Sequence, residues 1–170
     1  MAGIYIHIPF CKTRCKYCDF FSTTHLEKRT QYVDALLAEW HDRYPIHDIQ
    51  YTISTIYIGG GTPSTLDCTD LDKIISTCLQ SLHNTTQSLE ITLEKVQAGR
   101  RMGINRLSIG IQSFDDDLLR LLGRRHNTQQ ALDAVAIAQA AGFDNISIDL
   151  MYALPSQTMQ QWQRDVQMAL

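Results

Sequence analysis

Three cysteines lie close together near the start of the chain. Cys11, Cys15 and Cys18 have the spacing C-x3-C-x2-C, which places three thiols on one short loop. Three ligands are too few for a closed tetrahedral zinc site, and too few for an iron–sulfur cluster held entirely by protein. A [4Fe-4S] cluster bound by three cysteines keeps one iron open to a substrate or cofactor. The spacing therefore indicates a reactive metal centre.

Zinc is the main alternative for this loop, with His7 or His25 as the fourth ligand. Several aromatic side chains surround the cysteines, and these favour a cluster. A low dielectric and limited water protect iron and sulfide and tune the reduction potential. The aromatic residues are Phe10, Tyr17, Phe20 and Phe21.

A glycine run, 59–61, followed by Thr62, comes directly after a predicted strand. Without Cβ atoms the backbone can approach a ligand closely, although a tight turn explains the same glycines. The G-x-G-x-x-G spacing of a dinucleotide site is absent.

Polar side chains also occur at the ends of the later predicted strands. Glu94 and Gln112 each end a strand, where a surface or capping role is the alternative to ligand binding. Asp149 lies in an apolar strand and needs a partner, because an unpaired buried charge is costly. Arg124 is the candidate partner, either in a binding site or in a structural ion pair.

Hydrophobic periodicity predicts strands and helices in alternation. Strands are expected at 4–8, 53–58, 89–94, 106–111 and 146–151. Helices are expected at 26–44, 71–82 with Thr69 as N-cap, 96–102, 115–122, 128–141 and from 158 onward. Glycines should end three of them, at Gly103, Gly123 and Gly142. This order predicts an α/β domain with a parallel sheet of right-handed βα units, whose sites lie at the carboxyl ends of the strands.

Composition restricts the possible functions. The 170 residues suit one domain, and a net charge of −3 with scattered basic residues argues against nucleic-acid binding. Apolar stretches are too short to span a membrane, and no export signal is seen. Five cysteines, three of them crowded, fit a reducing cytosol better than disulfides, with Cys78 as a core thiol. We therefore expect a cytoplasmic protein.

Four segments and the cysteine loop together carry a family resemblance. The loop resembles that of radical S-adenosylmethionine (SAM) proteins. More narrowly, the chain is similar to the oxygen-independent coproporphyrinogen III oxidase family, and within it to the HemW-type branch of heme chaperones. The matching segments are 5–11 (YIHIPFC), 59–64 (GGGTPS), 110–114 (GIQSF) and 148–155 (IDLMYALP).

This resemblance implies a partial (βα)6 barrel, of which the chain contains about five βα units. Residues 1–170 would be the radical SAM core domain and the N-terminal part of a longer protein, with the sixth strand and a C-terminal domain lying outside it. Three thiolates would hold three irons, and the fourth iron would chelate SAM. An electron from the cluster would then release a 5′-deoxyadenosyl radical from SAM.

The resemblance also assigns residues to the SAM site. Glu94 and Gln112 would contact the ribose and methionine parts, and Tyr17 would flank the adenine. The remaining SAM contacts implied are Tyr5, Gly60, Gly61, Thr62, Arg124 and Asp149. His126 could be an axial heme ligand, although a solvated loop histidine is favoured.

Two functions follow from the resemblance. A heme chaperone would bind heme and pass it to a client protein, and would touch a membrane only through that client. A coproporphyrinogen III oxidase would instead act as an enzyme on a porphyrinogen. Both need an electron donor such as flavodoxin or ferredoxin. The oxidising branch carries a fourth cysteine where this chain has Phe20, which favours the chaperone.

One connection departs from the family pattern. Glu94 runs straight into Lys95 and Val96, where the family usually has a longer connection with an Asn-Pro element. Either residues have been deleted or a loop is missing from the chain as given, and the short predicted helix that follows favours a missing loop.

Overall fold

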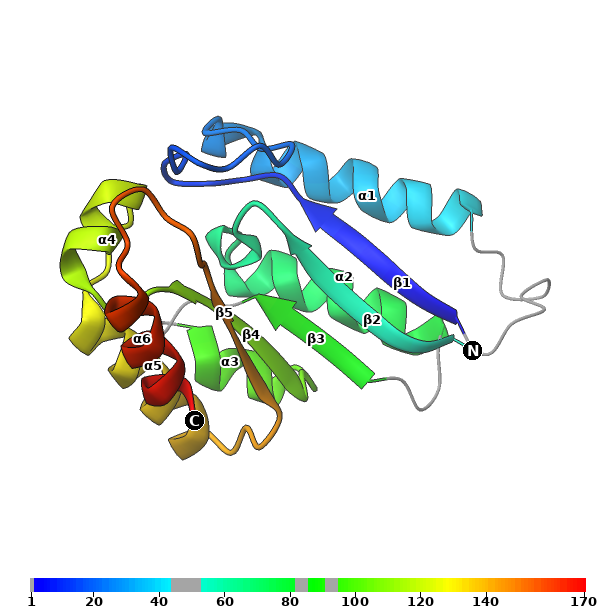
Figure 1. The fold of residues 1–170 in the computed structure, drawn as a ribbon. Coiled ribbons are helices and arrows are strands. Elements are labelled where there is room, and N and C mark those ends of the chain that lie inside the picture. Colours follow the sequence, from blue (N-terminus) through cyan, green and yellow to red (C-terminus); the bar gives the residue numbers. More distant parts are fainter. Residues whose placement is uncertain (1, 44–52, 82–85, 91–94) are drawn as a thin grey trace.

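The structure is a computed structural model that describes residues 2–43, 53–81, 86–90 and 95–170 (Figure 1). Five parallel strands form one sheet in the order β1-β2-β3-β4-β5. The strands are β1 (Ala2–Ile8), β2 (Ile53–Gly60), β3 (Thr86–Glu90), β4 (Arg106–Gln112) and β5 (Ile146–Leu150). The predicted alternation and the parallel sheet are thus confirmed.

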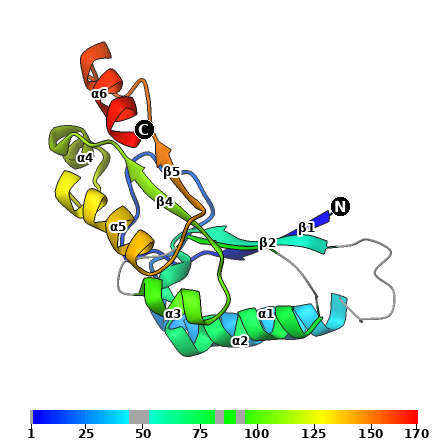
Figure 2. The same cartoon turned by 90° about the horizontal axis from the view of Figure 1, so that it is seen from below.

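Helices connect the strands and cover one face of the sheet. They are α1 (Arg29–Arg43), α2 (Cys68–Ser81), α3 (Val96–Arg101), α4 (Asp116–Leu122), α5 (Thr128–Ala140) and α6 (Met159–Ala169), with short 3-10 turns at Leu26–Lys28 and Pro63–Thr65. Figure 2 shows α1, α2 and α3 under the first strands and α4, α5 and α6 beside the last ones. The sheet curves between these two groups, and no helix in the described part of the chain covers its concave face.

Alternation along the strands sorts the side chains between the two faces. Ile4, Ile6 and Ile8 of β1 are buried, whereas Tyr5 is 55% exposed. The isoleucines pack with residues from β2 and from the apolar sides of α1 and α2. Cys78 of α2 is in this core, and burial raises the pKa of its thiol to about 12, which confirms it as a core thiol.

Helix ends follow the sequence signals with one exception. Gly103, Gly123 and Gly142 follow α3, α4 and α5 with positive φ angles, as the stop signals predict. The prediction of Thr69 as N-cap of α2 is wrong, because the carboxylate of Asp67 accepts the Asp70 N–H at 2.8 Å and α2 begins earlier, at Cys68. The last helix, α6, begins at Met159, close to the predicted start, and Thr158 is its N-cap.

The third predicted strand matches the structure only in part. The strand β3 spans Thr86–Glu90 and therefore begins before the predicted start. Residues 91–94, which are four of the six residues predicted for this strand and include Glu94, lie outside the described residues. No helix in the described part of the chain is long and apolar enough to cross a membrane.

The core predicts how mutation affects stability. Leu107 of β4 is completely buried, so Leu107→Ala should lower the free energy of unfolding by about 2–5 kcal/mol, through lost burial and the cavity left behind. Leu121→Ala on α4, where the side chain is 42% exposed, should cost no more than ~0.5 kcal/mol. Urea unfolding of both variants measures the difference, and equal losses would contradict this core assignment.

Candidate active site at the carboxyl edge of the sheet

The cysteine loop is a closed lobe that leaves β1 and returns beside it. Phe10 pairs with Thr23 in an isolated bridge, in which the Cys11 N–H donates to the Thr23 carbonyl at 2.9 Å. The Thr23 N–H in turn donates to the Pro9 carbonyl at 2.7 Å. Phe10 is buried and anchors the base of the lobe. This closure holds all three cysteines at the carboxyl end of β1.

The electrostatic environment of Cys11 includes the other two cysteines of the lobe. Burial is the main reason that the pKa of Cys11 is raised, and negative charge on Cys18 and Cys15 raises it further. The Thr62 hydroxyl opposes the shift by donating to Cys11 Sγ at 3.7 Å. Thiolates on one loop are stabilised by a cationic partner, and iron is a chemically suitable one.

The zinc alternative lacks the expected fourth ligand. Both ring nitrogens of His7 are engaged: Nδ1 with the Tyr5 hydroxyl at 3.1 Å and Nε2 with the Phe21 carbonyl at 2.8 Å. His25 is exposed and pairs with Glu27. Among the described residues no three His, Cys, Asp or Glu side chains are grouped to hold one metal ion. A four-iron cluster instead distributes its thiolate ligands over different irons, so three cysteines spread along one loop fit that group.

The glycine run is packed against the cysteine lobe. The Gly61 N–H donates to the Ile8 carbonyl and the Thr62 N–H to the Phe10 carbonyl, both at 2.8 Å. A Cβ on Gly61 would lie 2.9 Å from Cys11 Sγ and 2.8 Å from the Phe10 carbonyl oxygen. These glycines therefore allow β2 to approach the cysteine lobe closely, which agrees with the tight-turn explanation of the run. Their contact with a ligand stays a prediction.

Gly60 carries the backbone constraint of this turn. Its φ is +116°, which L side chains rarely adopt, and a Cβ there would lie 2.8 Å from the His7 ring. His7 also binds the Phe21 carbonyl, so the same side chain contacts both the glycine turn and the segment of the lobe that returns toward β1.

Arg124 joins the lobe to the opposite half of the sheet. Its guanidinium donates to Cys15 Sγ at 3.7 Å, to the Tyr17 hydroxyl at 3.4 Å and to the Gly110 carbonyl. Its Nε is buried and has no hydrogen-bond partner among the described residues. Burial is the main reason that the pKa of Tyr17 is raised, while Arg124 acts in the opposite direction.

The expected pairing of Arg124 with Asp149 is wrong. Asp149 is exposed, because it alternates with Ile148 and Leu150, which pack on the helix side, and so lies on the open face of the sheet. No ion pair joins it to Arg124. Asp149 lies opposite Gly110 in the register of β4 and β5, and Arg124 is held by the Gly110 carbonyl instead. The carboxylate of Asp149 therefore needs no buried partner.

Gln112 ends β4 in an unusual conformation. Its φ is +74°, and the register of β4 and β5 shifts between Gly110 and Gln112. The Met151 N–H donates to the Gln112 carbonyl at 2.8 Å and closes the irregularity. Bulges and left-handed non-glycine residues concentrate at functional sites, which agrees with the predicted role of this strand end.

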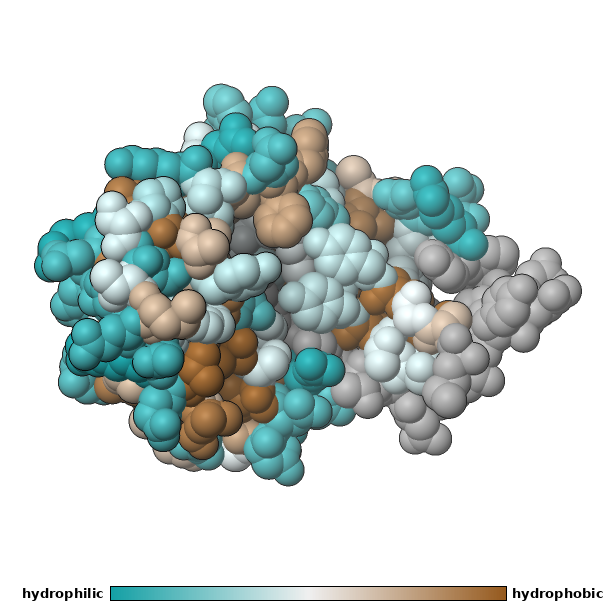
Figure 3. Space-filling view, viewed as in Figure 1, coloured by the Kyte–Doolittle hydropathy of each residue, from teal (hydrophilic) through white to brown (hydrophobic). Residues whose placement is uncertain are grey.

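Sequence analysis missed an aromatic pair on the concave face. Tyr5 and Tyr57 are neighbours in register and stack with ring centroids 5.7 Å apart. The Tyr5 hydroxyl donates to His7 Nδ1, because His7 Nε2 must donate to the Phe21 carbonyl. The signal was present in the sequence, since Ile56-Tyr57-Ile58 repeats the alternation around Tyr5. Figure 3 shows weakly hydrophilic side chains gathered on the open face, over the part of the sheet where Figure 1 places β1 and β2.

His126 is not the solvated loop histidine that was favoured. It is half-buried, and its Nε2 donates to the Ile111 carbonyl at 3.1 Å. Burial is the main cause that lowers the pKa of His126, and the charge of Arg124 adds to it. The ring is therefore held neutral beside the end of β4, with Nδ1 as its remaining acceptor.

Comparison with known proteins identifies the superfamily. A family model of the radical SAM superfamily matches residues 5–169. The heme chaperone HemW of Lactococcus lactis subsp. lactis is 36% identical over 171 residues, which cover 96% of this chain and 44% of that protein. The heme chaperone HemW of Escherichia coli is 36% identical over 185 residues, which cover 99% of this chain and 47% of that protein. The chain thus spans about half the length of these curated relatives.

Solved structures agree on the fold. The coproporphyrinogen III oxidase HemN from Escherichia coli, described as a radical SAM enzyme, superimposes with a TM-score of 0.87 at 29% identity, covering 98% of this chain and 40% of that one. Methylornithine synthase superimposes with a TM-score of 0.66 at 12% identity, which supports the fold alone. The predicted radical SAM α/β barrel, cut after about five βα units, is confirmed.

The contact between Gly61 and Cys11 predicts a specific defect. Gly61→Ala should displace the cysteine lobe, because the new Cβ meets backbone atoms that cannot rotate away. We expect less iron and acid-labile sulfide per chain after anaerobic reconstitution. Thr62→Val is the matched control: it keeps the branched shape and loses the hydroxyl that donates to Cys11 Sγ. It should keep the iron and lower the reduction potential. Full iron content in Gly61→Ala would contradict the packing argument.

Proposed function

Because this chain belongs to the radical SAM superfamily, we propose that it is the cluster- and SAM-binding part of a heme chaperone, which binds heme and transfers it to a client protein. The observation that carries the proposal is the cysteine lobe, whose three thiols are held at the carboxyl edge of the sheet against the glycine turn. The curated HemW relatives match nearly the whole chain at about one third identity, and they support the chaperone over other activities of the superfamily.

Cys11, Cys15 and Cys18 would hold the [4Fe-4S] cluster. Thr62 and Arg124 donate hydrogen bonds to the sulfurs of Cys11 and Cys15 respectively. Such bonds stabilise the negative charge of the thiolates and, by the same effect, favour the reduced cluster. When bound, the cluster supplies an electron to SAM. The chain's own contribution is to position the cluster and to set its reduction potential.

The residues proposed for SAM surround the same edge. Tyr5 and Asp149 are exposed, and Gln112 is half-buried at the end of β4. An exposed carboxylate can accept from hydroxyl or amino groups, and an amide can donate and accept. The remaining residues of the proposed SAM site are Tyr17, Gly60, Gly61, Thr62, Glu94 and Arg124, of which Glu94 lies outside the described residues.

A second candidate is oxidation of a porphyrinogen. The close superposition on HemN favours it, since that protein is a coproporphyrinogen III oxidase. Against it stands Phe20, which is 69% exposed beside Cys18, at the position where the oxidising branch carries a further cysteine. A phenyl ring offers no ligand and no redox chemistry there, so the chaperone is the better-supported proposal.

The electron donor is proposed to be a small acidic redox protein such as flavodoxin or ferredoxin. Lys12, Arg14 and Lys16 are exposed on the cysteine lobe and form no ion pair within the described part of the chain. The lobe is thus locally cationic on a chain whose net charge is −3. Complementary charge at this place would bring a donor close to the cluster. A cytoplasmic location, in agreement with five free cysteines, completes the proposal.

Heme binding separates the two candidate functions. After anaerobic reconstitution with iron and sulfide, the intact protein should change the heme absorption spectrum with saturable stoichiometry and should release heme to an apoprotein acceptor. Incubated with reductant, SAM and coproporphyrinogen III, it should form no protoporphyrinogen. Accumulation of protoporphyrinogen would replace the chaperone by the oxidase, and the absence of any heme-dependent change would overturn the chaperone proposal.

Charge reversal on the cysteine lobe tests whether an acidic electron donor docks there. Replacing Lys12, Arg14 and Lys16 together by Glu should slow cluster reduction by flavodoxin about tenfold at low salt, because electrostatic steering is lost. The effect should shrink as salt is added. Arg101→Glu is the control, since Arg101 is exposed at the end of α3, away from the carboxyl edge of the sheet. Equal rates in both variants would exclude this docking surface, while dithionite reduction should be unchanged.

A further inference from the structure

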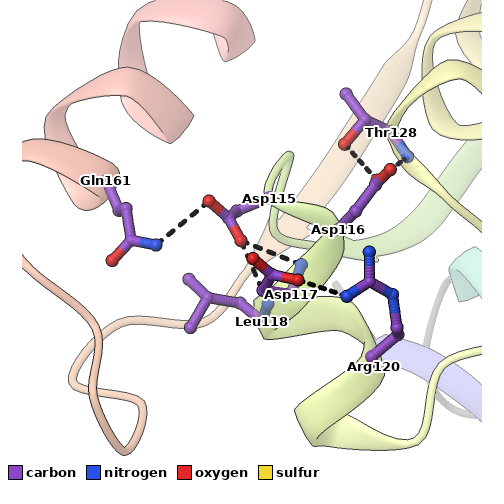
Figure 4. Close-up of polar contacts among 7 residues, drawn as sticks. All are labelled: Asp115, Asp116, Asp117, Leu118, Arg120, Thr128 and Gln161. Atoms are coloured by element: carbon purple, nitrogen blue, oxygen red, sulfur yellow. Dashed lines mark hydrogen bonds and ion pairs between the residues drawn. The ribbon is translucent and has the colours of Figure 1, made fainter.

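The loop between β4 and α4 is held by a helix from the far end of the chain. Residues 112–115 connect Gln112, which ends β4, to Asp115, which caps α4. The carboxylate of Asp115 accepts the N–H groups of Asp117 and Leu118, and also the Gln161 side-chain amide of α6 at 3.0 Å (Figure 4). This outer contact joins α6 to the start of α4.

A second and deeper contact involves Asp165 of α6. Asp165 is 1% exposed, and its two carboxylate oxygens accept from consecutive residues. Oδ2 accepts the Ser113 hydroxyl at 2.8 Å, and Oδ1 accepts the Phe114 N–H at 2.7 Å. The Ser113 oxygen also accepts the Asp115 N–H at 3.1 Å, so its own proton is directed to Asp165. Ser113 and Phe114 are both buried.

The residue immediately before these two is the strained one. A non-glycine residue at φ +74°, such as Gln112, is unfavourable and persists only where its surroundings determine it. The Met151 N–H holds its carbonyl from the β5 side. Asp165 holds the next two residues from the α6 side. The backbone of Gln112 is therefore fixed from both directions.

We propose that Asp165 is a positioning residue of the SAM site, which holds Gln112 in its left-handed conformation by binding Ser113 and Phe114. The inference rests on the proposed function, because Gln112 is one of the residues proposed to contact SAM. Asp165 itself is buried behind the loop and acts through Ser113 and Phe114. A carboxylate suits this role because both of its oxygens accept hydrogen bonds, whereas an amide offers only one acceptor.

The test compares Asp165→Ala, Asp165→Asn and Ser113→Ala with Asp133→Ala, in which an exposed carboxylate on α5 is removed. After anaerobic reconstitution, equilibrium dialysis with radiolabelled SAM should show binding about tenfold weaker in Asp165→Ala, because two buried donors lose their acceptor. Asp165→Asn and Ser113→Ala should give intermediate losses, and Asp133→Ala none. Iron content should match the unaltered protein in all four, since α6 lies apart from the cysteine lobe (Figure 1).

A second measurement needs no cofactor. Amide hydrogen exchange of the peptide covering residues 112–115 should become faster in Asp165→Ala and Ser113→Ala, with no change around residues 8–23. Unchanged SAM affinity and unchanged exchange in soluble Asp165→Ala would overturn the proposal. If Asp165→Ala does not fold, the same pair of results in Asp165→Asn and Ser113→Ala overturns it. If the unaltered protein does not bind SAM, the proposed function fails, and exchange alone decides whether Asp165 holds the loop.

Discussion

The structure of the site depends on how closely β2 approaches the cysteine lobe. Two backbone hydrogen bonds, from Gly61 to Ile8 and from Thr62 to Phe10, join the end of β2 to the end of β1 and the base of the lobe. No side chain fits between them, since a Cβ on Gly61 would meet Cys11 Sγ. The same approach brings the Thr62 hydroxyl to that sulfur. One steric constraint thus positions Cys11, a proposed cluster ligand, and its hydrogen-bond donor together.

Arg124 connects the opposite half of the sheet to the lobe, and an unusual backbone conformation lies beside it. Arg124, which follows α4, reaches Cys15, Tyr17 and the Gly110 carbonyl. The loop that precedes α4 begins with the strained Gln112 and is held by Asp165 from α6. Elements more than fifty residues apart in sequence therefore define the same edge. This is the arrangement expected where the carboxyl ends of parallel strands form a site.

Much of this could be predicted from the sequence. Alternation in 4–8 and 53–58 identified strands because one face must be buried under helices, and the glycine stop signals gave the helix ends. The cysteine spacing indicated a candidate metal-binding loop, because it places three potential ligands on one short segment. The prediction that Arg124 pairs with Asp149 was wrong, because a backbone carbonyl acceptor such as that of Gly110 leaves no signature in the sequence. The Asp165 contact was missed because it joins α6 to a loop far away in the chain.

The central claim is that three thiols hold a cluster with one iron open to SAM, and electron paramagnetic resonance tests it most directly. The protein is reconstituted and reduced without oxygen, and its spectrum is recorded before and after SAM is added. The account predicts a four-iron signal whose shape changes with SAM, and no such signal in Cys15→Ala. A reduced cluster signal that saturating SAM leaves unchanged would contradict it.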